Sequence, residues 1–264
     1  VIASSVAALR AKVAELGQDN VAAFFCEPIQ GSGGVIVPPV GWLKAMRETA
    51  HELDILFVAD EVITGFGRTG PMFACEAEGV SPDLMTVAKG LTAGYAPMGA
   101  VILSDAFYAG IADGAAPEAV IGHGYTYSGH PVSAAVGLEV IRLYTDGGIL
   151  ENGQKIGRQF EAGLAELAAH PLVGEARARG MLGALELVSD KAKKLAFDPT
   201  LGLSDRLFRI GYEQGILFRA FADGTIGLAP ALSCTDREME LLLQRLRHTL
   251  DRVLDDKDIR SAMA

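Results

Sequence analysis

Two charged residues, Asp60 and Lys89, each stand directly after a short apolar run of the chain. The runs are Ile55–Ala59 and Leu84–Ala88, and continuous apolar stretches of this length are typical of strands buried in a parallel sheet. Ligands of open parallel sheets bind outside the carboxyl ends of the strands. We therefore expect the Asp60 carboxylate and the Lys89 amine to be presented together in a crevice at that edge.

An amine and a carboxylate in one crevice suit a cofactor that carries both an aldehyde and a cationic nitrogen. Pyridoxal 5′-phosphate (PLP) is such a cofactor, since it forms a Schiff base with a lysine and its pyridinium nitrogen takes an acidic partner. A lysine among apolar neighbours can lose its proton and attack a carbonyl. Taken singly, Asp60 also fits a turn cap or a partner of Arg68, and Lys89 fits a solvated loop lysine. The pair at two strand ends favours PLP.

Four segments of the chain resemble the class III PLP-dependent aminotransferases, which adopt PLP fold type I. They follow one another in the family's order: EPIQGSGG at 27–34, DEVITGFGRTG at 60–70, PDLMTVAKGLTAGYAPMGAV at 82–101 and HGYTYSGHP at 123–131. The resemblance implies an α/β fold of the aspartate aminotransferase type, with a parallel-rich sheet in the large domain and a smaller C-terminal α+β domain. The family's N-terminal portion is missing from this sequence.

The resemblance also implies roles for individual residues. Lys89 would be the Schiff-base lysine and the general acid/base, and Asp60 would pair with the pyridine nitrogen. Val62, two residues further along the strand, points to the same side as Asp60 and would pack on the ring. Thr126 would bind the cofactor phosphate of the neighbouring subunit, with Tyr125 among the cofactor-binding residues. The active site of such a homodimer is shared between its subunits.

Substrate recognition in this family needs a carboxylate receptor, and Arg219 is our candidate, because the planar fork of arginine binds a carboxylate with two hydrogen bonds. Members that act with 2-oxoglutarate carry an arginine where this chain has Gly227, and usually a glutamine where it has Ile63. Both departures resemble the ω-amino acid–pyruvate branch. Glu27 is expected to face the same crevice as Asp60 and to support the site or to form a structural salt bridge.

The resemblance predicts an aminotransferase that moves an amino group from an amine or ω-amino acid to a keto acid, with pyruvate as the acceptor, by a ping-pong mechanism. Two alternatives stay open. The first is a PLP-dependent decarboxylase or aminomutase of the same fold. The second is an inactive fragment, because the absent N-terminal portion of the family supplies much of the cofactor cage.

Two other patterns in the sequence are better explained by structure than by binding. Gly65, Gly67 and Gly70 satisfy the dinucleotide motif G-x-G-x-x-G, which also needs an acidic residue ~20 positions further on, at the end of the next strand. This chain has Lys89 in that neighbourhood. We therefore expect a backbone-shaping loop. His123 and His130 lack a suitably spaced carboxylate or thiol, so no metal site is predicted.

Composition limits the partners and the compartment. The chain of 264 residues is half hydrophobic and carries a net charge of −10, which disfavours nucleic acid because phosphate binding needs a basic stripe. No apolar run approaches the ~20 residues of a membrane helix. Cys26, Cys75 and Cys234 lack metal or redox spacing, and no signal peptide is visible. We expect a cytoplasmic protein with small-molecule partners.

The apolar periodicity divides the chain into residues 1–148, as the second half of the large PLP-binding domain, and residues 149–264, as the small domain. In the first part it predicts helices and a parallel sheet. In the second part, Thr235-Asp-Arg-Glu238 has the spacing of a capping box at the start of a final helix. The expected elements of the first part are helices at 4–16 and 131–144, an amphipathic stretch from 42 to 53, and strands at 21–25, 55–59, 84–88 and 100–103.

Overall fold

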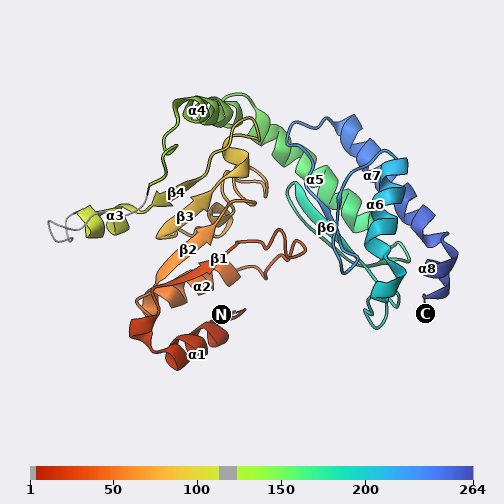
Figure 1. The fold of residues 1–264 in the computed structure, drawn as a ribbon, viewed down its shortest axis with the longest axis horizontal. Coiled ribbons are helices and arrows are strands. Elements are labelled where there is room, and N and C mark those ends of the chain that lie inside the picture. The colour runs from red at the N-terminus through yellow and green to blue at the C-terminus, as the bar shows by residue number, and fades with distance from the viewer. Residues whose placement is uncertain (1–3, 113–123, 264) are drawn as a thin grey trace. The chain divides into compact units, whose positions relative to one another are not determined.

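This computed structural model describes residues 4–112 and 124–263, and its chain trace is drawn in Figure 1. The chain forms two compact units. The first consists of Val1–Pro28, Pro38–Phe66 and Pro71–Gly147, and the second of Ile29–Val37, Gly67–Gly70 and Gly148–Ala264. Two short loops from the first half of the sequence thus belong to the second unit.

The first unit contains a four-stranded sheet in the order β1-β2-β3-β4. Its strands are β1 (Ala23–Cys26), β2 (Leu56–Asp60), β3 (Leu84–Val87) and β4 (Ala100–Leu103). The first three strands are parallel, as expected for a parallel-rich sheet, but β4 is antiparallel to β3. The expectation of parallel strands separated by helices is therefore wrong for β4. Only a short 3-10 helix and turns connect β3 to β4, and a parallel crossover needs a longer, usually helical, connection.

Helices α1 and α2 bury a stripe of apolar side chains in one core with β2. Helix α2 contributes Leu43 and Met46, helix α1 contributes Leu9 and Val13, and Phe57 of β2 is fully buried against them. The α-helices of this unit are α1 (Val6–Leu16), α2 (Trp42–Glu52), α3 (Asp105–Ala112) and α4 (Pro131–Thr145), and its 3-10 helices are Gln18–Asn20, Ala74–Glu78 and Lys89–Leu91.

The second unit is an antiparallel sheet in the order β5-β6-β8-β7, covered by helices. Helix α5 packs on β5 and β6, and α7 packs on α5 and α6 (Figure 1). The elements are α5 (Ile149–Leu167), β5 (Val173–Arg179), β6 (Leu182–Leu187), a 3-10 helix at Pro199–Leu201, α6 (Leu203–Glu213), β7 (Arg219–Ala220), β8 (Ile226–Leu228), α7 (Asp236–Leu254) and α8 (Lys257–Ser261).

Local signals in the sequence explain how the helices of the second unit begin and pack. The predicted capping box is confirmed, because Thr235 and Glu238 exchange side-chain and backbone hydrogen bonds at the start of α7. In α5, Phe160 and Leu164 are buried directly against Gly183 of β6, where an added Cβ would lie 2.4 Å from a Leu164 methyl carbon. Glycine is required there because the helix approaches the strand so closely.

Candidate cofactor and active site

Three of the residues singled out in the sequence lie at one edge of the first sheet. Glu27 directly follows β1, Asp60 ends β2, and Lys89 stands two residues beyond the end of β3. Because these three strands are parallel and adjacent, their carboxyl ends share an edge. Cys26 lies among the carboxylates of this edge: burial, followed by the negative charges of Glu27, Asp60 and Glu61, raises its pKa to about 12.

The Asp60 carboxylate is held through a single oxygen. Its Oδ1 accepts hydrogen bonds from the Thr86 hydroxyl and from the Val62 amide, each at 3.0 Å. No hydrogen bond reaches Oδ2 from residues 4–112 or 124–263. The strand ends at Asp60 and Val62 lies in a turn, so the strand alternation expected to place both side chains on one side does not extend to Val62.

Lys89 has an unusual backbone conformation and a side chain that is not enclosed by apolar neighbours. Its side chain is exposed in the described part of the chain, and its φ of +35° lies in the left-handed region that side chains other than glycine rarely adopt. Such backbone outliers cost of order 1–3 kcal/mol and cluster at functional sites. The next residue, Gly90, lies so close to Phe66 that an added Cβ would be 2.7 Å from that residue's Cβ. The Tyr144 hydroxyl donates to the Gly90 carbonyl at 3.0 Å.

Glu61 is a structural residue of the site that the sequence did not reveal. Its side chain is fully buried. Oε2 accepts hydrogen bonds from the Thr64 hydroxyl and the Ala74 amide, and Oε1 accepts one from the Cys75 amide at 2.8 Å. The carboxylate therefore closes the loop that follows Asp60. The sequence pointed to Glu61 only through its position beside Asp60. Its hydrogen-bond partner Ala74 lies 13 residues further along the chain, so the contact depends on how the loop folds back.

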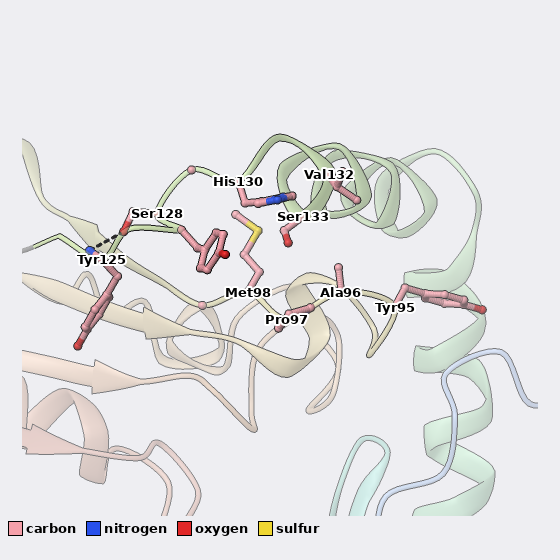
Figure 2. A pocket seen from close by; sticks show the side chains of 12 residues that line it. Tyr95, Ala96, Pro97, Met98, Tyr125, Ser128, His130, Val132 and Ser133 are labelled. Atoms are coloured by element: carbon pink, nitrogen blue, oxygen red, sulfur yellow. Dashed lines mark hydrogen bonds between the residues drawn. The ribbon is translucent and has the colours of Figure 1, made fainter.

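The loop that carries Thr126 lies on another part of the first unit. Thr126 and its neighbour Tyr125 are exposed, and the turn is closed by the Ser128 hydroxyl, which accepts a hydrogen bond from the Tyr125 amide at 3.0 Å. Figure 2 shows Ser128 of this loop and His130 at the start of α4 facing the Tyr95–Met98 segment across a pocket. The volume of the pocket is about 640 Å³. Its lining residues are Tyr95–Gly99, Tyr125, Tyr127–His130, Val132 and Ser133. Asp60, Val62 and Lys89 do not line it, and His123 of the same motif lies outside the described residues.

Arg219 lies in the second unit, in register with Gly227. The two residues face each other across the β7–β8 ladder, and the exposed guanidinium of Arg219 stands 5.7 Å from the centre of the Phe221 ring. An added Cβ at Gly227 would lie 2.7 Å from the same ring. Glycine at position 227 therefore makes room for the aromatic ring on which Arg219 rests.

The glycine-rich turn after β2 is shaped by Arg68. This side chain donates hydrogen bonds to the Met181 carbonyl at 2.8 Å and to the Pro230 carbonyl. Gly67 and Gly70 both have positive φ, so the turn needs residues without a Cβ. Arg68 thus anchors this loop within the second unit.

Comparisons with known proteins identify the family. The model of the family described as aminotransferase class-III matches residues 2–250. The chain belongs to the class III aminotransferases. Within this family it is 44% identical over 245 residues to the putrescine–pyruvate aminotransferase of Pseudomonas aeruginosa, covering 92% of this chain and 52% of that protein.

Solved structures of transaminases confirm the fold of this class III chain. An (S)-enantioselective ω-transaminase from Thermomicrobium roseum matches with a TM-score of 0.90 at 39% identity, over 95% of this chain and 55% of that one. An amine transaminase from an uncultivated Pseudomonas species, described in its PLP-bound internal aldimine form, matches with a TM-score of 0.88 at 38% identity, over 94% of this chain and 56% of that one. The chain thus spans about half the length of the relatives it matches.

Class III aminotransferases depend on PLP, and the residues at the sheet edge fit this cofactor. Asp60 offers a carboxylate oxygen without a hydrogen bond in the described chain, and Lys89 offers an exposed amine beyond the neighbouring strand. Among the described residues, no cluster of three potential metal ligands is found, and no helix is both long and apolar enough to cross a membrane.

Proposed function

We propose that the protein is a PLP-dependent aminotransferase that moves an amino group from an amine or ω-amino acid to a keto acid, with pyruvate as acceptor, in two half-reactions of a ping-pong cycle. The observation that carries this proposal is the edge of the first sheet, where an anchored Asp60 ends β2 and an exposed Lys89 follows the adjacent parallel strand β3. Family membership supports the reaction class.

In this proposal each residue of the edge has a separate task. Bound PLP would supply an aldehyde to take up amino groups and a protonated ring to withdraw electrons. Lys89 would hold the cofactor through its Nζ and would take up and return a proton at the same atom. The Asp60 carboxylate would favour the protonated form of the ring nitrogen. Val62 packs on the ring, and Glu27 supports the same edge.

We also propose that the protein works as a homodimer in which Thr126 binds the cofactor phosphate of the partner subunit. The exposed loop around Thr126 supports this assignment, because Tyr125 and Tyr127 have 77% and 80% of their surface in solvent. Large aromatic side chains presented together on a surface favour burial in a protein interface. Tyr125 would line the cofactor site from the same loop.

The acceptor is proposed from the second unit. Arg219 binds the substrate carboxylate. Position 227 is glycine here, so the arginine that members acting with 2-oxoglutarate carry at this position is absent. The space at Gly227 supports this assignment, because a larger residue there would displace the Phe221 ring beneath Arg219. The name of the Pseudomonas aeruginosa relative, a putrescine–pyruvate aminotransferase, agrees with it. The three cysteines are free thiols, which supports a reducing compartment such as the cytoplasm.

The first experiment tests the cofactor lysine. The full-length protein that carries this sequence is loaded with PLP, and the visible absorbance of the protein-bound cofactor is compared in wild type, Lys89→Ala and Lys44→Ala. Lys44 is an exposed lysine of α2 and serves as the matched control. The band should disappear in Lys89→Ala and persist in Lys44→Ala. An unchanged spectrum of Lys89→Ala would refute the assignment.

The second experiment tests the reaction. A panel of amines, diamines and ω-amino acids is offered with pyruvate or 2-oxoglutarate, and the alanine or glutamate that forms is measured. We expect pyruvate-dependent alanine formation with parallel double-reciprocal plots, the pattern of a ping-pong cycle. Carbon dioxide release or an acceptor-independent amino shift would instead establish a decarboxylase or an aminomutase. A strong preference for 2-oxoglutarate would contradict the roles of Arg219 and Gly227.

A further inference from the structure

The Thr86 hydroxyl lies in β3 and reaches across to the neighbouring strand. Asp60 and Thr86 are partners in the parallel register of β2 and β3. Side chains of partnered residues in a parallel pair stand on the same side of the sheet, so their short polar groups meet. The resulting distance from Thr86 Oγ1 to Asp60 Oδ1 is 3.0 Å. The contact therefore follows from the register of the sheet.

The backbone around this contact is held as well. The Glu61 amide donates to the Thr86 carbonyl at 2.9 Å, which continues the pairing of the two chain segments one residue beyond Asp60. The Val62 amide donates to the same Oδ1 that Thr86 contacts. Two donors, one on β3 and one in the turn after β2, thus fix one oxygen of the carboxylate. Threonine suits this place because its β-branched side chain has few rotamers.

We propose that Thr86 is a positioning residue for the cofactor: by holding Asp60 Oδ1 it directs Oδ2 toward the ring nitrogen. This inference rests on the proposed function. Thr86 acts through Asp60 and makes no bond to the reacting atoms. The two oxygens of Asp60 differ in what they can still accept. Oδ1 already accepts two hydrogen bonds and is a poor acceptor for a third, whereas Oδ2 keeps its lone pairs. Hydrogen bonds to an ionised acceptor are also the stronger ones.

The test uses the full-length protein and three single variants. Thr86→Val removes the hydroxyl at equal size, and Thr86→Ser keeps a hydroxyl. Thr249→Val is the matched control, because in the described part of the chain its buried hydroxyl donates only to the Arg245 carbonyl of its own helix. The dissociation constant of PLP is measured for each, together with the pH at which the visible band of the bound cofactor changes.

We expect Thr86→Val to weaken PLP binding about tenfold, the effect of losing one hydrogen bond to a charged group. Thr86→Ser and Thr249→Val should stay within about twofold of wild type. In Thr86→Val the pH midpoint of the visible band should rise, because a ring nitrogen that is less firmly protonated withdraws fewer electrons. A purely structural role for Thr86 would leave that midpoint unchanged.

A double variant keeps the inference testable if Thr86→Val loses stability for other reasons. In an Asp60→Ala background, Thr86→Val should change PLP affinity by less than about twofold, because the partner through which it acts is gone. An undiminished effect in that background would overturn the inference, and so would wild-type binding by Thr86→Val. If wild type itself binds no PLP, the proposed function fails first, and the inference fails with it.

Discussion

The buried carboxylate of Glu61 gives the most demanding test of this structure. Glu61→Ala removes the acceptor of three hydrogen bonds in a fully buried site. The Ala74 amide, the Cys75 amide and the Thr64 hydroxyl each lose the bond that they donate to this carboxylate. Hydrogen bonds to a charged group contribute about 1.5–3 kcal/mol each. Part of that sum is offset because a buried carboxylate is itself costly. We expect a net loss of about 3–5 kcal/mol in the free energy of unfolding.

Glu61→Gln separates the shape of the side chain from its charge. The amide keeps one oxygen but turns an NH₂ group toward the buried donors that the carboxylate satisfied, so a loss of about 2 kcal/mol is expected. Glu240→Ala, at an exposed position of α7, is the matched control and should change the free energy by less than about 0.5 kcal/mol.

The assay is equilibrium unfolding of the full-length protein in urea, combined with hydrogen exchange of the backbone amides. The amides of Ala74 and Cys75 should lose protection in both Glu61 variants, since each donates to this carboxylate. A loss of less than about 1 kcal/mol in Glu61→Ala, or wild-type protection of these two amides, would contradict this role of the Glu61 carboxylate.

Two further predictions concern the second unit. Burial lowers the pKa of His170 from its ordinary value of 6.5, so its contribution to stability is complete above about pH 6.5 and is lost as the pH falls toward the lowered value. The unfolding free energy of wild type should therefore decline across this window more steeply than that of His170→Asn, and equal slopes would contradict the assignment. Gly227→Ala should cost about 1–3 kcal/mol, because its Cβ would meet the Phe221 ring at 2.7 Å. Gly110→Ala, on exposed helix α3 where an added Cβ meets no atom of the described residues within 4 Å, should be neutral or slightly stabilising. A comparable loss there would remove the steric explanation for Gly227.

Local patterns explain why the elements around the site could be read in advance. An apolar run of a few residues indicates a buried strand by itself, so Asp60 and Lys89 could be placed after strands without knowledge of their neighbours. The capping box at Thr235 is local in the same way, because all of its groups lie within one turn. The direction of β4 could not be predicted from the sequence. It depends on whether the connection after Lys89 crosses over the sheet or turns back beside β3, and the composition of a strand does not determine the path of its connection.

The sequence by itself determined the kind of chemistry, because the Asp60 and Lys89 segments and their order along the chain already resemble one enzyme family. Only the tertiary structure decided how that chemistry is held in place. Thr86 meets Asp60 from 26 residues away through strand register, and Glu61 is buried by a loop that returns at Ala74. Arg219 faces Gly227 for the same reason. Contacts of this kind depend on which strands pair and in what register, and register is fixed by the packing of the whole sheet.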